Sequence, residues 1–175
     1  MHQGISRVIL PTIGALLMLA FFGFFTAQRF HVFSEQPLGS DADVSTTANA
    51  TALDLSNKGL TATPSWVFDR TSLETLDLSG NDLAGALPSQ IGHLINLRTL
   101  NASHNRMTGV PAEIGQLQHL EYLDLSYNQL TGLPHELGNL QQLRILNLTG
   151  NPGVSSLDLA YIRTHAPKTT EIILQ

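Results

Sequence analysis

The chain repeats itself, and this repetition limits what its 175 residues can fold into more than any other feature. A segment of the form L-x-x-L-x-L-x-x-N, with apolar residues at the leucine positions, starts at Leu73, Leu97, Leu120 and Leu143. The starts are 24, 23 and 23 residues apart, and a fainter copy begins 23 residues earlier at Ala50. A period of this length predicts short structural units stacked along one axis.

Each unit has two halves with different apolar spacing. In the first half, apolar residues at positions 4 and 6 alternate with polar ones, which predicts a short strand with one buried face. In the second half, a proline ends the strand and a following apolar pair, such as Leu137 and Leu140 after Pro134, covers the opposite wall. One unit alone cannot bury its leucines, so the units must share one core. The position-4 leucines should lie in single file: Leu76, Leu100, Leu123 and Leu146.

An asparagine recurs at position 9 of each unit, where the chain turns. Its amide can both donate to and accept from backbone groups that would otherwise be unpaired in the dry interior. We therefore expect a structural asparagine ladder inside the stack, formed by Asn81, Asn105, Asn128 and Asn151.

These repeats closely resemble the leucine-rich repeat family, whose signature is this segment with one more apolar position after the asparagine. The unit 73–96 looks like the plant receptor type, and the following units look like the broader 23-residue type. The resemblance implies an α/β solenoid: a right-handed superhelix with a short parallel concave sheet of about five strands, and a usual role in binding proteins. Extracellular members in animals and plants usually have cysteine-rich caps. The absence of cysteine here therefore favours a bacterial envelope protein.

The repeats divide the region 50–175 into a leucine-rich repeat domain with a cap at each end. In the front cap, 50–72, we expect Trp66 to pack as part of a capping layer. In the back cap, 154–175, the apolar residues predict a short helix over 154–164, and the segment Ile172-Ile173-Leu174 predicts an edge strand. The core repeats between the caps are 73–96, 97–119, 120–142 and 143–153.

An uncharged apolar stretch, residues 8–27, precedes the repeats. As a helix it would span roughly 30 Å, the thickness of the hydrocarbon core of a bilayer. It is longer than the roughly 7 to 15 apolar residues of a cleaved signal, and Phe25 would place a bulky ring where the cleavage site needs a small residue. We expect one transmembrane helix that remains as a signal anchor, with a cleaved, secreted form as the alternative.

The charges beside this stretch indicate its orientation. Two positive charges, Arg7 and the amino terminus, precede the stretch, and one, Arg29, follows it. This slight excess of positive charge before the stretch favours a cytoplasmic amino terminus. Residues 1–7 would then be a cytoplasmic stub, and the repeat domain would be periplasmic or extracellular. Residues 28–49 are rich in Ser and Thr with little apolar periodicity, which predicts a flexible tether with a reach of about 25 Å.

Composition excludes several classes of function. With 9 Lys+Arg against 14 Asp+Glu and a net charge of -5, the chain has no basic surface for nucleic acid. The absence of cysteine excludes disulfides, thiolate metal sites and a cysteine nucleophile. The seven histidines are dispersed, and no phosphate-binding glycine loop or nucleophilic serine motif occurs. We therefore expect no enzyme activity, no catalytic residue, no cofactor and no metal site.

A binding surface is expected among the outward positions of the concave face. Tyrosine and arginine contribute most to binding energy at interfaces. We predict a patch clustered on the third to fifth strands, made of Arg98, His104, Tyr122, Tyr127, Arg144 and Ile145. A polar row at position 5 could bind a cation, but Leu-Asp-Leu-Ser is usual in this family, so we interpret it as a solvated row: Asp54, Asp77, Asn101, Asp124 and Asn147.

The sequence thus predicts a membrane-anchored leucine-rich repeat protein that binds a protein partner outside the membrane. Five strands span only about 20 to 25 Å, so a modest, transient interface is expected. Two alternatives stay open: an adhesive or structural envelope component that binds glycan, and a scaffold that faces the cell interior. A sugar ligand would favour stacked aromatic residues, and the predicted patch offers only Tyr122 and Tyr127, which favours protein.

Overall fold

A computed structural model describes residues 50–175 of the chain. The stub, transmembrane helix and tether predicted for residues 1–49 lie outside the described residues. Within 50–175, no helix combines the length and the apolar character needed to cross a bilayer.

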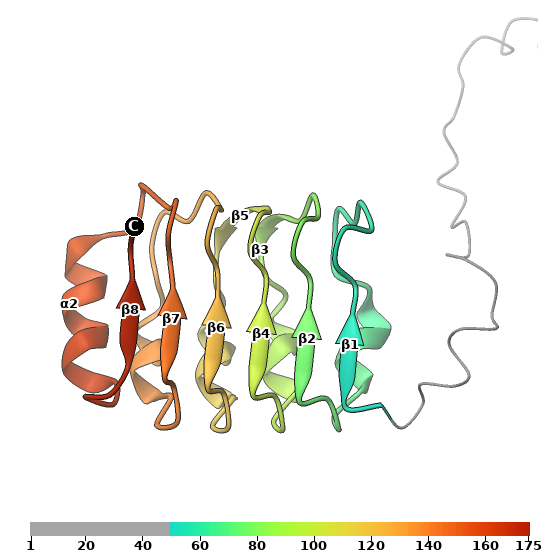
Figure 1. Cartoon of the computed structure of the whole chain (residues 1–175), viewed down its shortest axis with the longest axis horizontal. Helices are drawn as coiled ribbons and strands as arrows, with labels where there is room; N and C mark the ends of the chain where they lie inside the picture. The colour runs from blue at the N-terminus through green and yellow to red at the C-terminus, as the bar shows by residue number, and fades with distance from the viewer. Residues whose placement is uncertain (1–49) are drawn as a thin grey trace, which may run out of the picture. The chain divides into compact units, whose positions relative to one another are not determined.

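The described region is a stack of short strands backed by short helices (Figure 1). The strands of the large sheet are β1 (Ala52–Asp54), β2 (Thr75–Asp77), β4 (Thr99–Asn101), β6 (Tyr122–Asp124), β7 (Ile145–Asn147) and β8 (Glu171–Ile173). The 3₁₀ helices are η1 (Ser65–Asp69), η2 (Ser89–His93), η3 (Ala112–Gln116) and η4 (His135–Asn139). The remaining elements are β3 (Ala84–Ala86), β5 (Arg106–Gly109) and the α-helix α2 (Ser156–His165).

The large sheet is parallel throughout, with its strands in the order β1-β2-β4-β6-β7-β8. Its register pairs each position-4 leucine with the next one along the stack, and all of them are fully buried. This confirms the predicted single file and the solenoid with a parallel sheet. The predicted edge strand is β8, which places Ile172 beside Leu146 and brings the sheet to six strands.

The wall opposite the large sheet is built from the 3₁₀ helices. A proline immediately precedes each of them, with φ between -60° and -74°, the range to which its ring restricts the backbone. In η2, η3 and η4 one apolar side chain then points inward, and Ile91, Ile114 and Leu137 are fully buried. The proline and apolar pair of each unit therefore form the wall that the sequence predicts.

The small sheet of β3 and β5 was not predicted. These two strands pair in parallel, with a register shift between Gly85 and Ala86. Gly85 has a φ of 76°, in the left-handed region that glycine adopts without steric cost. The strand β3 reads Ala-Gly-Ala and is exposed on all three residues, so it carries no apolar alternation from which a strand could be predicted.

The front of the stack ends in η1, which carries the three apolar residues Trp66, Val67 and Phe68. Val67 and Phe68 occupy the inward positions of η1 and are buried, so Trp66 is left 41% exposed. The guanidinium carbon of Arg70 lies 5.2 Å from the centre of the Trp66 ring, within the range of a cation–π contact. Trp66 therefore packs against Arg70 on the outer side of the front cap, while Val67 and Phe68 fill its inner side.

The back of the stack is closed by α2, as the sequence predicts. Its amino-terminal end is capped by the Ser155 side chain, which accepts a hydrogen bond from the Leu157 N–H at 3.1 Å. The Tyr161 ring lies between the rings of His135 and His165, with centroid distances of 3.9 Å to both. Because His135 belongs to η4, this stack of rings attaches α2 to the unit 120–142. Ile162 completes the contact from inside the core.

The asparagine ladder links adjacent units through buried hydrogen bonds. The Asn128 side-chain amide donates to the carbonyls of Ala102 and Leu125, both at 3.0 Å, and its Oδ1 accepts from the Met107 N–H at 3.0 Å. Asn128 is only 5% exposed. Equivalent bonds between neighbouring units are formed by Asn81, Asn105 and Asn151.

Replacing Asn128 with alanine should lower the free energy of unfolding by about 1 to 3 kcal/mol, because buried backbone groups of two units lose their partner. Urea unfolding followed by circular dichroism measures this change. The matched control is Gln129→Ala, since Gln129 is the next residue and is exposed. Equal losses in the two variants would show that the ladder does not stabilise the stack.

Candidate functional site

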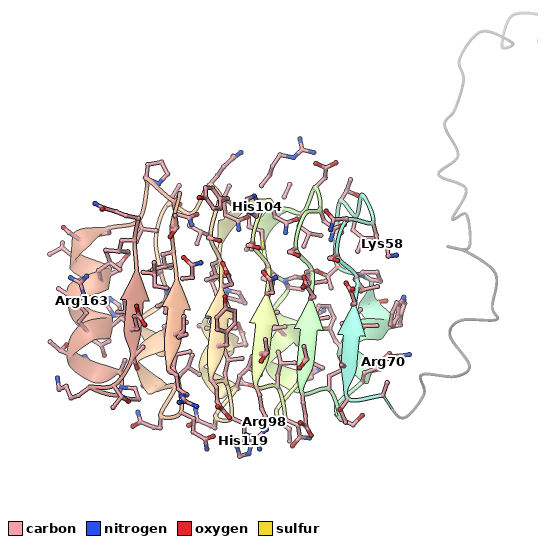
Figure 2. All side chains as sticks on the ribbon, in the orientation of Figure 1. Lys58, Arg70, Arg98, His104, His119 and Arg163 are labelled. Atoms are coloured by element: carbon pink, nitrogen blue, oxygen red, sulfur yellow. The ribbon has the colours of Figure 1, made fainter. Side chains whose placement is uncertain are left out.

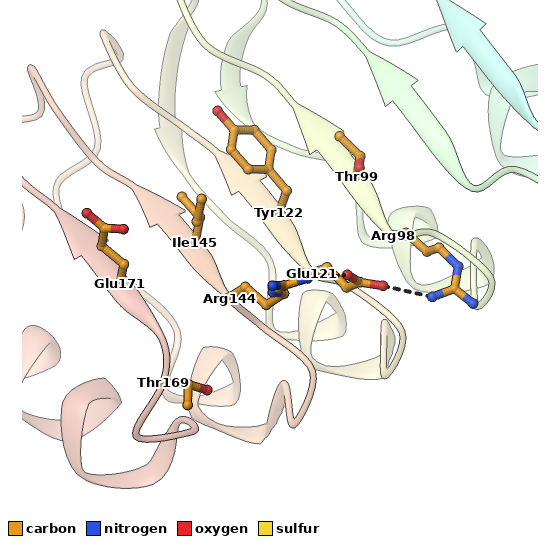
Figure 3. Close-up of a pocket in the computed structure, with 8 residues that line it drawn as sticks. All are labelled: Arg98, Thr99, Glu121, Tyr122, Arg144, Ile145, Thr169 and Glu171. Carbon is orange, nitrogen blue, oxygen red and sulfur yellow. Dashed lines mark hydrogen bonds and ion pairs between the residues drawn. The ribbon is translucent and has the colours of Figure 1, made fainter.

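A hollow of about 540 Å³ lies over the starts of β4, β6, β7 and β8 on the open face of the large sheet (Figure 3). The in-register sheet aligns equivalent repeat positions into columns, so position 2 and position 3 of successive units form two parallel rows here. The hollow is lined by Arg98, Thr99, Glu121, Tyr122, Arg144, Ile145, Thr169 and Glu171.

The position-3 column provides the apolar part of the hollow. Its members point away from the core because the position-4 residues beside them point inward. The register places Tyr122 next to Ile145 and Ile145 next to Glu171 (Figure 3). Tyr122 and Ile145 are half-buried, and Glu171 is exposed. A small apolar centre is thus flanked by an acidic residue.

The position-2 column alternates in charge along the stack. Arg98 Nη1 lies 2.8 Å from Glu121 Oε1, and Arg98 Nε lies 3.9 Å from Glu74 Oε2. Arg144 Nη1 is 3.6 Å from the second oxygen of Glu121, and its side chain is 76% exposed. Exposed ion pairs of this kind add little stability. They do, however, position the two guanidinium groups along one rim of the hollow.

Tyr122 is tied to the neighbouring polar row. Its hydroxyl donates a hydrogen bond to Asp124 Oδ2 at 3.0 Å. Burial of the phenol raises the pKa of Tyr122 above its ordinary value, and the hydrogen bond and negative charge of Asp124 raise it further. The phenol is therefore held in its neutral, donating form.

The polar row at position 5 makes its hydrogen bonds internally. Asn101 donates to Asp77 Oδ2 at 3.1 Å, and Asn147 donates to Asp124 Oδ2 at 3.0 Å. Each member of the row also accepts from the backbone N–H two residues later. Over the region 50–175, no three His, Cys, Asp or Glu side chains are grouped in a way that could hold a metal ion. The row is accounted for by these bonds within the sheet.

His104 and Tyr127 lie near the opposite ends of the strands from the hollow, at position 8 of their units. Their rings stack with centroids 4.4 Å apart and an interplanar angle of 17°. Both residues have positive φ, 54° and 52°, which costs a residue other than glycine about 1 to 2 kcal/mol. The equivalent residues also have positive φ, and they are Asn57, Gly80 and Gly150.

The six residues of the predicted patch therefore lie in two groups and not in one cluster. Arg98, Tyr122, Arg144 and Ile145 line the hollow. His104 and Tyr127 are five or six repeat positions further along, which at about 3.3 Å per residue in a strand corresponds to roughly 16 to 20 Å. Figure 2 shows Arg98 and His104 at opposite ends of the strands. The prediction of a single patch did not distinguish the start of a strand from the turn after it.

Sequence reasoning missed two acidic residues of the hollow. Glu121 alternates with Arg98 and Arg144 at position 2, and this pattern is visible in the repeat alignment once each column is examined by itself. Glu171 belongs to the final strand, which does not carry the repeat signature. Its place beside Ile145 could not be derived without the register of β8.

Comparison with known proteins identifies the family of this fold. A family model described as a leucine-rich repeat region matches residues 50–160. Because the match covers more than half of the sequence, the chain belongs to the leucine-rich repeat family. No curated protein matches the chain at a significant level.

Three solved structures illustrate the likeness. The plant peptide hormone receptor RGFR1, in complex with RGF2, is 32% identical with a TM-score of 0.57, and the match covers 70% of this chain and 20% of the receptor. The leucine-rich repeat protein LIC12759 of Leptospira interrogans is 31% identical with a TM-score of 0.58, covering 74% and 38%. A chain of the BIR3–SERK2 complex from Arabidopsis thaliana is 41% identical with a TM-score of 0.55, covering 59% and 57%. The chain spans less than two thirds of each of these proteins.

The raised pKa of Tyr122 can be checked by titration, since the whole chain contains only three tyrosines. Because the neutral phenol is favoured in the folded state, Tyr122 stabilises the fold fully below the ordinary tyrosine pKa, and this stabilisation is lost as the pH rises through the raised value. Tyrosinate absorbance should show a late ionisation that is missing in Tyr122→Phe and kept in Tyr127→Phe. A late ionisation that persists in Tyr122→Phe would contradict the assignment.

Proposed function

We propose that this protein is a binding module that holds a segment of another protein in the hollow of its sheet face. The observation that carries this proposal is the composition of the hollow, in which Tyr122 and Ile145 form an apolar centre and charged residues form the rim. Protein interfaces have this arrangement, with buried aromatic and apolar anchors surrounded by polar groups that stay accessible to water.

The similar structures support the same kind of partner. RGFR1 was solved in complex with RGF2, and BIR3 was solved in complex with SERK2. In both structures a chain with the repeat fold of this protein is bound to a peptide or to another protein. The hollow here covers parts of only four strands, which favours a short partner segment and a transient complex. Several copies binding at once would raise the overall affinity of such a complex.

We further propose that residues 8–27 anchor the protein in a membrane, with the repeat domain on the outer side. The uncharged stretch is long enough to span the hydrocarbon core, and the absence of cysteine is compatible with a bacterial envelope. In this arrangement the anchor would keep the repeat domain near the membrane surface, where attachment raises the effective concentration for a partner in the same envelope.

Photocrosslinking tests the binding face. A photoreactive phenylalanine analogue in place of Ile145 should form a covalent adduct with the partner in intact cells. The same analogue in place of Ala112, which is exposed on η3 in the opposite wall, should form much less. Equal adduct formation at the two positions, or adducts only at Ala112, would contradict binding through the sheet face.

Reporter fusions test the orientation. Alkaline phosphatase, which becomes active only after export, should be active when fused to the carboxyl terminus. Deleting residues 8–27 should abolish this activity and move the protein out of the membrane fraction, because the remaining chain has no comparably long uncharged apolar stretch. Activity of a carboxyl-terminal reporter that functions only in the cytoplasm would contradict the orientation.

A further inference from the structure

We propose that the partner segment inserts a lysine or arginine into the hollow, with the aliphatic stem on Ile145 and the cationic group paired with Glu171. This inference rests on the proposed function and specifies the chemistry of the partner. Three observations lead to it: the charge of the sheet face, the unpaired state of one carboxylate, and the apolar side chain beside that carboxylate.

The outward columns of the large sheet carry far more negative than positive charge. The basic residues of positions 2, 3 and 5 are Arg98 and Arg144. The acidic residues of the same positions are Asp54, Glu74, Asp77, Glu121, Asp124 and Glu171. A face with this excess of carboxylates attracts basic segments and repels acidic ones, including nucleic acid and anionic lipid.

Most of the carboxylates around the hollow are already engaged by neighbouring groups. Glu121 is shared between the two arginines of its column. Asp124 accepts hydrogen bonds from the Tyr122 hydroxyl, the Asn147 amide and the Ser126 N–H. The Glu171 side chain, by contrast, makes no hydrogen bond or ion pair within the region 50–175, and it is exposed at the edge of the hollow (Figure 3).

The neighbour of Glu171 determines which cation fits. Ile145 is its direct partner in the strand register, so their backbones are about 4.8 Å apart and both side chains leave the same face of the sheet. Lysine and arginine have an apolar stem and a charged end, and such side chains pack their stem on apolar surface while the charge stays at the rim. One such side chain therefore satisfies both residues at once, which an acidic or a purely aliphatic side chain cannot do.

Selection of peptides on the immobilised full chain in detergent micelles tests this inference. The probe is a library of random peptides of fixed length, and the measurement is the enrichment of residue types together with the affinity of one selected peptide. The wild-type protein should select peptides with lysine or arginine. For the selected peptide, Glu171→Lys should weaken binding about tenfold or more, and added salt should also weaken it.

The matched control is Asp69→Lys, which makes the same charge change at an exposed residue of η1 and should leave the selection unchanged. Selection on Glu171→Lys should shift the preference from basic to acidic residues. Circular dichroism and thermal melting establish that each variant is folded.

The outcomes separate this inference from the proposed function. If binding is lost in Ile145→Ser but the selected peptides show no basic preference, or keep it in Glu171→Lys, the partner chemistry proposed here is wrong and the binding face stands. If no selected peptide depends on Ile145, the proposed binding face is wrong and this inference fails with it.

Discussion

The structure depends on the stacking of units that cannot bury their own leucines. Each position-4 leucine lies between the leucines of the neighbouring strands and faces the apolar residues of the opposite wall, and the Asn128 amide connects backbone groups of two units at once. Hydrophobic burial and buried hydrogen bonding therefore act across the same boundary between neighbours. A defect at one boundary exposes apolar and polar groups together, so each boundary contributes its own share to the stability of the whole stack.

The same stacking aligns the side chains at one repeat position of successive units into a line on the surface. Position 3 supplies the apolar centre, position 2 the alternating charges and position 5 the hydrogen-bonded row. The framework leucines and asparagines are fixed by the core, whereas the outward positions are free to vary. Tyr122 and Ile145 replace the smaller Thr75 and Thr99 of the preceding units, and this local enlargement distinguishes the end of the sheet that carries the hollow.

Elements that follow from the apolar periodicity could be predicted from the sequence. Features that depend on strand register or on unusual backbone conformation could not. The single file of leucines, α2 and the edge strand β8 follow from apolar spacing and are present. The pairing of Ile145 with Glu171 depends on how β8 joins the sheet, and no repeat signature marks that strand. The predicted patch divides into two groups because four of its residues occupy positions 2 and 3, at the start of a strand, whereas His104 and Tyr127 occupy position 8, in the turn after it. The left-handed backbone at position 8 is indicated in the sequence only by the Gly and Asn residues at equivalent positions.

The alternating charges of position 2 have a consequence for how this protein can change in evolution. Solenoids gain and lose length by duplicating or deleting units. The order Glu74, Arg98, Glu121, Arg144 tolerates duplication of two units at a time, which preserves the alternation. Duplication of one unit would place two carboxylates or two guanidinium groups on adjacent strands about 4.8 Å apart, where like charges repel. Growth by pairs is therefore the electrostatically favoured route for descendants of this chain.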